Sequence, residues 1–133
     1  MLLPLIEKEI KKLFSAKIIV TLRFSKWVAN LVPVKKNNGE IRLYVYFSNM
    51  NKVSLKDNYP LPKMDHVLQK VVGEEIIYTM DGFSEYNQVK VLPEDQEKIA
   101  FNTPWGTFMY AKMAFGLMNI GSTFQRAMDI YFA

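Results

Sequence analysis

A carboxylate follows an apolar run in the second half of the 133-residue chain. The run 76–80 predicts a buried strand, and it leads directly into Asp81 and Gly82. Because a strand holds the side chain at its end rigidly, such a carboxylate is a candidate metal ligand or catalytic acid. An Asp-Gly pair is also typical of an ordinary turn. From the residues alone, both interpretations of Asp81 stay open.

The composition excludes several other kinds of site. The chain has no cysteine, so it has no disulfide framework, thiolate metal site or thiol nucleophile. Its single histidine, His66, excludes a His-rich metal site. No stretch approaches the roughly 18 consecutive apolar residues of a membrane span, and the apolar opening at residues 1–5 is too short for a secretory signal. We therefore expect an intracellular protein without a membrane segment.

The net charge of +4 divides unevenly along the chain. Residues 1–70 hold 13 Lys and Arg against 5 Asp and Glu, whereas residues 71–133 hold 4 against 8. A basic half suits contact with RNA or DNA, because Lys and Arg that neutralise phosphates release counterions. The acidic half would repel the same phosphates unless divalent cations mediate the contact. Two solvated surfaces of opposite sign are the alternative.

The apolar pattern predicts a hairpin in the basic half. Strands are expected at 27–35 and 40–47, and the turn residues 36–39 join them. Alternation gives the second strand one apolar and one polar face. The apolar face carries Ile41, Leu43, Val45 and Phe47, and the polar face carries Arg42, Tyr44, Tyr46 and Ser48.

The remaining pattern mixes helices and strands. An amphipathic helix begins at Pro4, a short helix ends at Gly73, and Ser122 is expected to cap a last helix. Further strands are predicted at 87–92, 98–103 and 107–113, with turns at 93–95 and 104–106. The side chains expected to point inward on the three helices are Ile6, Ile10, Leu13 and Phe14, then Met64, Leu68, Val71 and Val72, then Phe124, Ala127, Met128 and Tyr131.

A series of short motifs runs through nearly the whole chain. They lie at 27–30, 34–36, 39–42, 51–53, 56–62, 80–84, 86–88, 94–98, 104–108, 115–117 and 123–128. In this order and at this spacing they resemble the reverse transcriptases of long-terminal-repeat retrotransposons, especially the gypsy type found in plants. The resemblance implies an α+β fold, with the fingers and the first half of the palm of a right-hand polymerase built from antiparallel sheets and short packed helices.

The resemblance implies a catalytic role for one matching residue. Asp81 matches the first of three catalytic carboxylates, and the carbonyl group of Gly82 beside it is the implied metal contact. In the family, two magnesium ions about 4 Å apart activate a primer 3′ hydroxyl and stabilise the leaving pyrophosphate. Mg²⁺ is therefore the implied cofactor. The implied partners are an RNA or DNA template-primer and a deoxynucleoside triphosphate.

The resemblance also implies residues that contact the nucleotide. Lys35 or Lys36 and Arg42 match positions that bind the incoming triphosphate, although by themselves they are ordinary solvated charges of the hairpin. Tyr86 matches the bulky residue under the incoming sugar, which excludes a ribose 2′ hydroxyl.

A loop and a helix supply the other matches. Phe115 and Gly116 match the loop that packs beside the nucleotide, and Gln125 matches a Gln of the following helix. Without the resemblance, residue type alone predicts that Tyr86 and Phe115 are ordinary core residues.

The chain departs from the family at several positions. The polar strand face usually reads Arg, Asp, Arg, whereas here it has Arg42, Tyr46 and Ser48, so a charge pair of the fingers is lost. Glu85 replaces a common Gly, and its carboxylate is expected to repel the triphosphate or to strain a turn. The Tyr-x-Asp-Asp hairpin that carries the other two catalytic carboxylates has no match, and these 133 residues contain no Asp-Asp pair.

We therefore expect a partial reverse transcriptase domain, with about 1–75 fingers-like and about 76–133 a partial palm that is cut before the hairpin. The rest of the palm, an RNase H region and an integrase are its expected partners in a polyprotein. One alternative is an inactive retroelement remnant that at most binds nucleic acid. The other is an unrelated α+β domain with chance matches. This chain alone is expected to be inactive as a polymerase.

Overall fold

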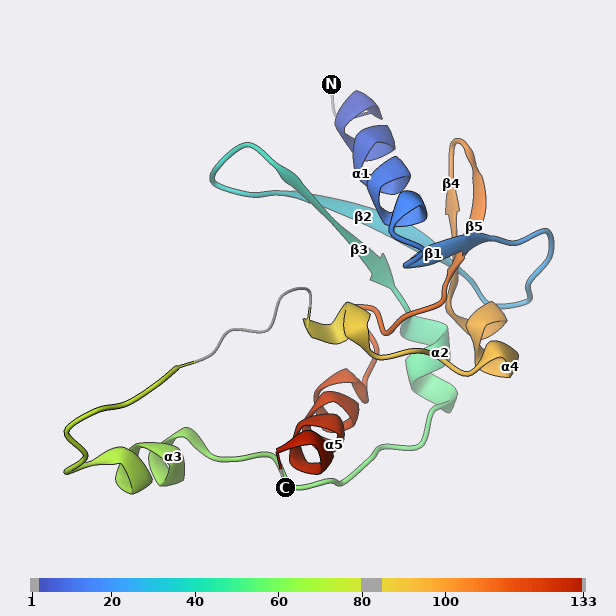
Figure 1. Cartoon of the computed structure of the whole chain (residues 1–133). Coiled ribbons are helices and arrows are strands. Elements are labelled where there is room, and N and C mark those ends of the chain that lie inside the picture. The colour runs from blue at the N-terminus through green and yellow to red at the C-terminus, as the bar shows by residue number, and fades with distance from the viewer. Residues whose placement is uncertain (1–2, 80–84, 133) are drawn as a thin grey trace.

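A five-stranded sheet forms the centre of the protein. The computed structural model describes residues 3–79 and 85–132, without the side chain of Glu85. The strands are β1 (Ile19–Thr21), β2 (Val28–Lys35), β3 (Ile41–Tyr46), β4 (Ala100–Thr103) and β5 (Gly106–Tyr110). Their order across the sheet is β1-β5-β4-β2-β3 (Figure 1). Neighbours pair antiparallel except β2 and β4, which run parallel. The α+β prediction is confirmed, with this one parallel pairing added.

The first helix packs across the sheet. α1 spans Leu3–Ser15, starting one residue before the predicted Pro4, and it contacts β1 and β3, the two edge strands. Ile6 and Ile10 are buried as expected, whereas Phe14, also expected to point inward, is 49% exposed. Burying an apolar stripe against the sheet removes that surface from water, which is the main favourable contribution to folding. The buried apolar residues of helix and sheet form one core, with members Ile6, Ile10, Ile19, Ile41, Leu43, Val45, Phe47, Ile99, Phe101, Phe108, Tyr110 and Ala114.

β2 and β3 form the predicted hairpin. Its turn contains Gly39, whose φ of +85° lies in the left-handed region that favours glycine. The register places Val34 opposite Arg42 and Lys35 opposite Ile41. Along β3, burial alternates between a buried face and a more exposed face, so the predicted division into an apolar and a polar face is confirmed.

The strand predicted at 76–80 is not found among the residues that the structure describes. Residues 76–79 have no regular structure, and Ile76, Ile77 and Tyr78 are 71%, 54% and 89% exposed. Met80 lies outside the described residues. An apolar run predicts a strand only if another strand pairs with its backbone N–H and C=O groups. In the described part of the chain, no strand pairs with residues 76–79.

The strand predicted at 87–92 is also wrong in large part. The 3₁₀ helix η1 (Glu85–Gln88) occupies its start, and its end leads into α4 (Pro93–Gln96). A single bridge between Lys90 and Lys112 is the strand-like feature here. The predicted turn at 93–95 is the first turn of α4, because Pro93 and the acids after it favour a helix N-terminus.

The second half contributes two confirmed strands. The strands predicted at 98–103 and 107–113 correspond to the shorter β4 and β5, which the turn at 104–105 joins. A second 3₁₀ helix, η2 (Glu97–Ile99), precedes β4, and the short helix α2 (Ser48–Val53) follows β3.

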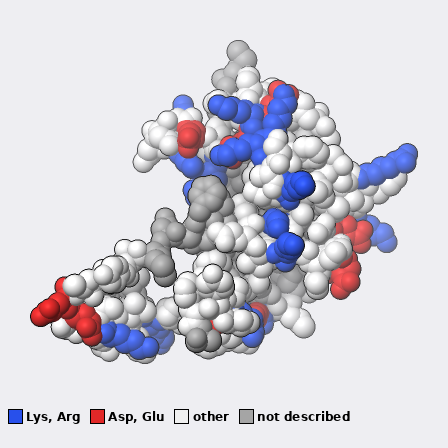
Figure 2. All heavy atoms as spheres, viewed as in Figure 1, with Lys and Arg blue, Asp and Glu red and all other residues white. Residues whose placement is uncertain are grey.

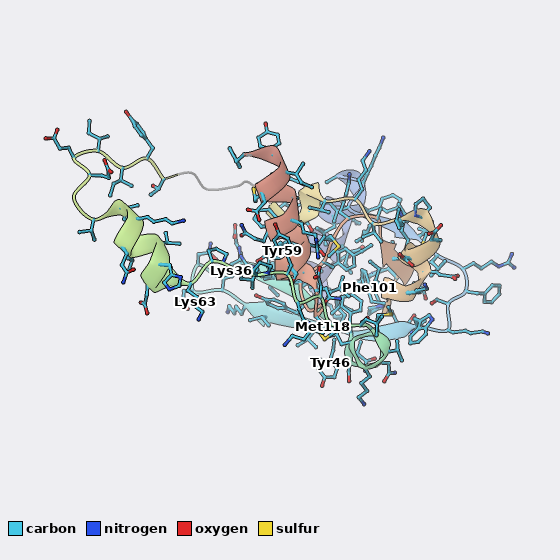
Figure 3. The ribbon with its side chains drawn as sticks, turned by 90° about the horizontal axis from the view of Figure 1, so that it is seen from below. Lys36, Tyr46, Tyr59, Lys63, Phe101 and Met118 are labelled. Carbon is cyan, nitrogen blue, oxygen red and sulfur yellow. The ribbon has the colours of Figure 1, made fainter. Side chains whose placement is uncertain are left out.

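Residues 62–79, here called the arm, extend away from the sheet in two views (Figures 1 and 3). The arm contains the predicted short helix as α3 (Met64–Val71). Apart from half-buried Val71, every arm residue is exposed. The expectation that α3 buries an apolar face is therefore wrong: Met64 and Leu68 are 70% and 52% exposed. Local spacing is sufficient for the helix, but burial requires a facing element.

The last helix, α5, spans Ile120–Tyr131 and confirms the predicted helix with two corrections. Asn119, not Ser122, is its N-cap, and Ser122 lies within the first turn as the buried residue of the helix. Phe124, Ala127 and Met128 are half-buried, whereas Tyr131 is 79% exposed.

None of the helices in the described ranges 3–79 and 85–132 has the length and apolar character needed to cross a membrane.

Candidate functional site

Four aromatic rings from different elements meet beside β3. The Phe115 ring lies on the segment between β5 and α5, and its centroid is 5.9 Å from that of Tyr44 on β3 and 5.0 Å from that of Tyr86 on η1. The ring of Phe124 on α5 is 5.3 Å from Tyr86. All three pairs meet edge to face, which is the favoured geometry for aromatic rings. We call Arg42 and these rings the Arg42 cluster.

Arg42 completes the cluster with a positive charge. Its guanidinium carbon lies 5.6 Å from the centroid of the Phe115 ring, within the range of a cation–π contact. Its Nη1 lies 3.5 Å from the Tyr44 hydroxyl, which is the long limit of a hydrogen bond. The guanidinium is therefore oriented by two aromatic side chains and keeps most of its five N–H donors for another partner.

Gly116 fits the cluster for a steric reason. A Cβ at this position would lie 2.7 Å from the Val45 carbonyl oxygen, which is closer than real Cβ atoms approach. Its φ of +98° is also a conformation that side-chain-bearing residues rarely adopt. The segment that carries Phe115 thus lies directly against β3. A side chain at this position would therefore force this segment and β3 to shift relative to each other.

Of the predicted nucleotide contacts, the structure brings together Arg42, Tyr86, Phe115 and Gly116. The two lysines lie elsewhere on the hairpin. Lys35 is opposite Ile41 in the register, so its side chain leaves the face of the hairpin opposite to that of Arg42. Lys36 lies at the turn, where its Nζ pairs with the Glu40 carboxylate at 3.4 Å.

The predicted catalytic residue Asp81 and its neighbour Gly82 lie outside the described residues. In the ranges that the structure describes, no three His, Asp or Glu side chains lie close enough to hold a metal ion.

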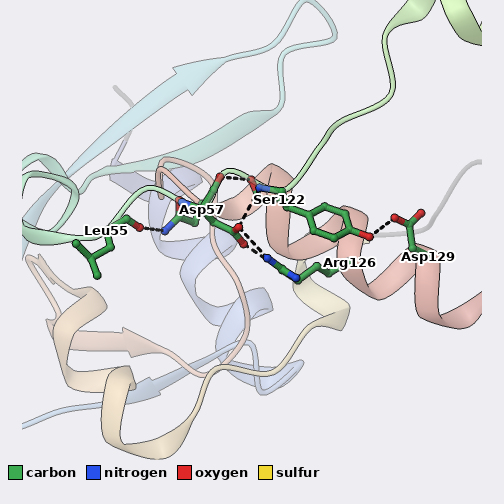
Figure 4. A network of polar contacts seen from close by, with 7 residues as sticks. Leu55, Asp57, Ser122, Arg126 and Asp129 are labelled. Carbon is green, nitrogen blue, oxygen red and sulfur yellow. Dashed lines mark hydrogen bonds and ion pairs between the residues drawn. The ribbon is translucent and has the colours of Figure 1, made fainter.

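A second group of polar contacts ties residues 55–59 to α5 (Figure 4). The Asp57 carboxylate accepts two hydrogen bonds from the Arg126 guanidinium, from Nε at 3.1 Å and from Nη2 at 2.9 Å. Such two-point pairing fixes orientation as well as distance. The Asp57 carbonyl accepts a bond from the Ser122 hydroxyl at 3.2 Å. We call this group of contacts the α5 clasp.

Tyr59 extends the clasp along the helix. The Arg126 guanidinium carbon lies 4.3 Å from the centroid of the Tyr59 ring, and the Tyr59 hydroxyl donates a hydrogen bond to Asp129. Gln125 donates to the other oxygen of Asp129 at 2.9 Å. Gln125, a residue matched by resemblance, therefore contacts another residue of its own helix.

The clasp shifts the pKa values of its members in the directions that its hydrogen bonds predict. The bonds from Arg126 lower the pKa of Asp57, and the same bonds raise the pKa of Arg126. The hydrogen bond from the Tyr59 hydroxyl lowers the pKa of Asp129, and the pKa of Tyr59 rises for the same reason. Both carboxylates are thus held in their charged form.

Charged side chains gather unevenly over the face seen in Figure 2. Lys and Arg crowd over α1 and reach the middle of this face, whereas Asp and Glu gather around α4 and at the outer end of the arm. The asymmetry of the sequence therefore has a spatial counterpart. On this face Lys and Arg predominate over the body, with some acidic side chains among them over α1. We call this Lys- and Arg-rich part of the face the positive surface.

The sequence pattern identified part of these sites. The position of Tyr44 two residues after Arg42 already placed it on the same strand face. The clasp was missed, because Asp57 and Arg126 lie 69 residues apart and no periodicity links them. Only covariation between the two positions would have indicated such a pair.

The Arg42 cluster combines a cation with aromatic rings in a way that suits a phosphorylated ligand. A guanidinium binds phosphate oxygens through its parallel N–H groups. Aromatic rings beside it offer flat apolar surface to a sugar or a base. The geometry therefore fits a ligand with both an anionic and a ring-shaped part.

No model of a protein family matches the chain, but curated retrotransposon proteins do. It is 32% identical over 103 residues to the retrovirus-related Pol polyprotein from transposon 297 of Drosophila melanogaster, and 33% identical over 92 residues to that from transposon gypsy of the same species. These matches cover 77% and 69% of the chain. The chain spans only about a tenth of the length of these polyproteins, 10% and 9%.

Solved reverse transcriptases have the same fold. Prototype foamy virus protease-reverse transcriptase matches 94% of this chain with a TM-score of 0.82 at 19% sequence identity, over 17% of its own length. The foamy viral enzyme in complex with dsDNA matches 94% of the chain with a TM-score of 0.77 at 15% identity, over 26% of its length. The chain therefore has a reverse transcriptase-like α+β fold. The expected resemblance is confirmed for retrotransposon Pol polyproteins in general, and the gypsy type of plants stays a prediction.

Proposed function

We propose that the chain is the fingers and first half of the palm of a retrotransposon reverse transcriptase, an RNA-directed DNA polymerase. The fingers-like part is about 1–75 and the partial palm is about 76–133. The reverse transcriptase-like fold and the similarity to Pol polyproteins support this proposal. The rest of the palm, RNase H and integrase would belong to the same polyprotein.

The observation that carries the proposal is the convergence of Arg42, Tyr86 and Phe115 from three separate elements. In the proposed function, the Arg42 guanidinium binds phosphate oxygens of a deoxynucleoside triphosphate. Tyr86 lies under its sugar, and Phe115 packs beside it. Lys35 and Lys36 act only as general positive charge, since the register and the Glu40 ion pair keep them from the cluster.

The positive surface of the body supports binding of a template-primer. The neighbouring foamy viral structure contains dsDNA, and a surface rich in Lys and Arg attracts any nucleic acid through counterion release. The proposed partner is therefore an RNA or DNA duplex bound without sequence preference. Mg²⁺ at Asp81 is part of the proposal by resemblance, and Asp81 lies outside the described residues.

A matched pair of arginine variants tests the nucleotide site. Arg23 also lies over a phenylalanine ring, with its guanidinium carbon 5.4 Å from the centroid of Phe24, but outside the Arg42 cluster. We expect Arg42→Ala to weaken dTTP binding roughly tenfold or more, as for a lost charge-assisted hydrogen bond. Arg23→Ala should leave it unchanged. Equal losses in both variants, measured by fluorescence or NMR titration, would show general electrostatics instead of a site.

The second candidate is a remnant that binds nucleic acid without chemistry. One observation favours it: Asp129, the last carboxylate of the sequence, is already bound by Tyr59 and Gln125. Purified chain should bind RNA and DNA with an affinity that falls steeply with salt, and it should not extend a primer in the presence of Mg²⁺. Extension that Asp81→Asn abolishes would exclude the remnant hypothesis. Salt-independent binding would exclude nucleic-acid contact through the positive surface.

A further inference from the structure

We propose that Asn51 is a positioning residue that holds Phe115 in the Arg42 cluster. The inference rests on the proposed function for its consequence, namely nucleotide binding. The orientation of the Phe115 ring by Asn51 follows from contacts within this chain and does not depend on the proposed function.

Both ends of the Asn51 amide bind the segment that follows Phe115. The Nδ2 group donates to the Gly116 carbonyl at 2.8 Å, and Oδ1 accepts the Met118 N–H at 2.9 Å. An amide is the side-chain group that supplies one donor and one acceptor side by side. Asn51 therefore pairs with residues 116–118 as a neighbouring strand would pair with them.

Asn51 is itself fixed to the strand that carries Arg42. Its backbone N–H donates to the Phe47 carbonyl at 2.9 Å, and the Phe47 ring is buried in the core, 2% exposed. α2 thus begins directly from the end of β3. The side-chain bonds of Asn51 connect β3 and α2 to the segment that carries Phe115. They therefore fix the position of Phe115 relative to Arg42 on β3.

The Asn51 bonds act on the exposed part of this segment. Ala114 is buried in the core and Leu117 packs against it, whereas the Phe115 ring between them is 37% exposed and has room to move away from β3. The two Asn51 bonds oppose that movement. If the segment lifts, Phe115 loses its edge contacts with Tyr44 and Tyr86, and the cation–π contact with Arg42 is lost with them.

A second amide holds the other end of the same segment. Asn119 donates from Nδ2 to the Leu55 carbonyl at 2.7 Å and accepts the Asp57 N–H at Oδ1, at 2.9 Å. It anchors the start of α5, whereas Asn51 anchors the residues next to Phe115. This division of roles allows the effect of Asn51 to be separated from docking of the helix.

The experiment uses the full 133-residue chain, with NMR of the Met118 amide and of the Phe115 ring protons, together with a dTTP titration. Asn51→Ala removes both bonds. We expect exchange of the Met118 amide to accelerate about fivefold or more, the Phe115 ring signals to shift, and dTTP affinity to fall. Asn49→Ala is the matched control, because Asn49 lies exposed on the same helix. Unchanged amide signals of β4 and β5 will show that each variant is folded.

A third variant tests the two-point geometry. In Asn51→Asp, the ionised carboxylate accepts from the Met118 N–H but repels the Gly116 carbonyl oxygen, and only the protonated acid donates to it. The Phe115 ring signals should therefore approach those of the original chain as the pH falls through the range where the introduced acid titrates. A role limited to filling space would show no such pH-dependent rescue.

The outcomes separate the two proposals. If Asn51→Ala leaves the Met118 amide and the Phe115 ring signals unchanged, or leaves dTTP affinity unchanged while the original chain binds dTTP, the positioning role is wrong. If the original chain does not bind dTTP, the nucleotide site of the proposed function is wrong, and the NMR signals still decide whether Asn51 orients Phe115.

Discussion

The body of the protein and its arm contain helices of similar character with opposite environments. α1 and α3 both have an amphipathic pattern. α1 buries Ile6 and Ile10 against the edge strands of the sheet, whereas α3 has no buried residue. The spacing of apolar residues thus determines that a helix forms, and the presence of a facing surface determines whether it contributes to a core.

The α5 clasp adds a second way of attaching an element to the body. α5 is only partly buried along its length, yet it is held by the hydrogen bonds that Asp57 accepts from Arg126 and that Tyr59 donates to Asp129. The arm begins a few residues later, at 62, and its residues are exposed apart from half-buried Val71. Attachment by polar pairs therefore ends where the arm begins, and the exposed apolar residues of the arm are left to a different partner or to solvent.

Truncating one apolar residue in each helix tests this contrast with the largest expected effect. Ile10→Ala in α1 should lower the free energy of unfolding by about 2–5 kcal/mol, because Ile10 is 4% exposed and a cavity would remain. Leu68→Ala in α3, 52% exposed, should change it by less than about 0.5 kcal/mol. Urea denaturation followed by circular dichroism measures both. A loss for Leu68→Ala as large as that for Ile10→Ala would mean that the arm packs against the body in solution.

The same contrast explains how far the sequence predicts the fold. α1 and the β2–β3 hairpin were predicted closely because local periodicity and a turn with Gly39 specify them. The strand at 76–80 was wrong for its described residues because an apolar run contains no information about its partner. Periodicity likewise cannot identify the parallel pairing of β2 with β4, since it joins residues far apart in the chain.

The candidate site also has a part that the sequence identifies and a part that only the structure reveals. Arg42, Tyr86 and Phe115 were selected by resemblance, since by residue type alone two of them are ordinary aromatics. The structure places the three together. Lys35 was selected in the same way, and the strand register puts it on the other face. A matching motif therefore identifies a position in the chain, and the pleat of the strand decides which way its side chain points.

The pH dependence of stability tests the packing of the body at the buried Tyr110, with a smaller expected effect. Burial raises the pKa of Tyr110 to about 12. In the unfolded chain the pKa of this tyrosine is near 10. The folded state is therefore stabilised relative to the unfolded state as long as the Tyr110 side chain is neutral. This contribution is complete below about pH 10 and is lost as the pH rises toward 12, by about 2–3 kcal/mol in all. Urea denaturation between pH 9 and about 12 should therefore show a steeper loss of stability for the original chain than for Tyr110→Phe. Parallel curves would mean that Tyr110 is accessible to water.

The smallest effect is expected where the body holds α5 by the clasp. The bonds from Arg126 lower the pKa of Asp57, so its contribution is present above the ordinary carboxyl range and is lost as the pH falls through the lowered value. Asp57 and Arg126 are 26% and 52% exposed, and water competes for both. Acidification should therefore release the Arg126 Nε–H, seen as an NMR shift, before the core unfolds. Asp57→Asn should remove this transition, whereas Asp65→Asn in the arm should leave it in place. If the Arg126 signal followed global unfolding in all three proteins, α5 would be held by its apolar face, and the clasp would be only a consequence of that packing.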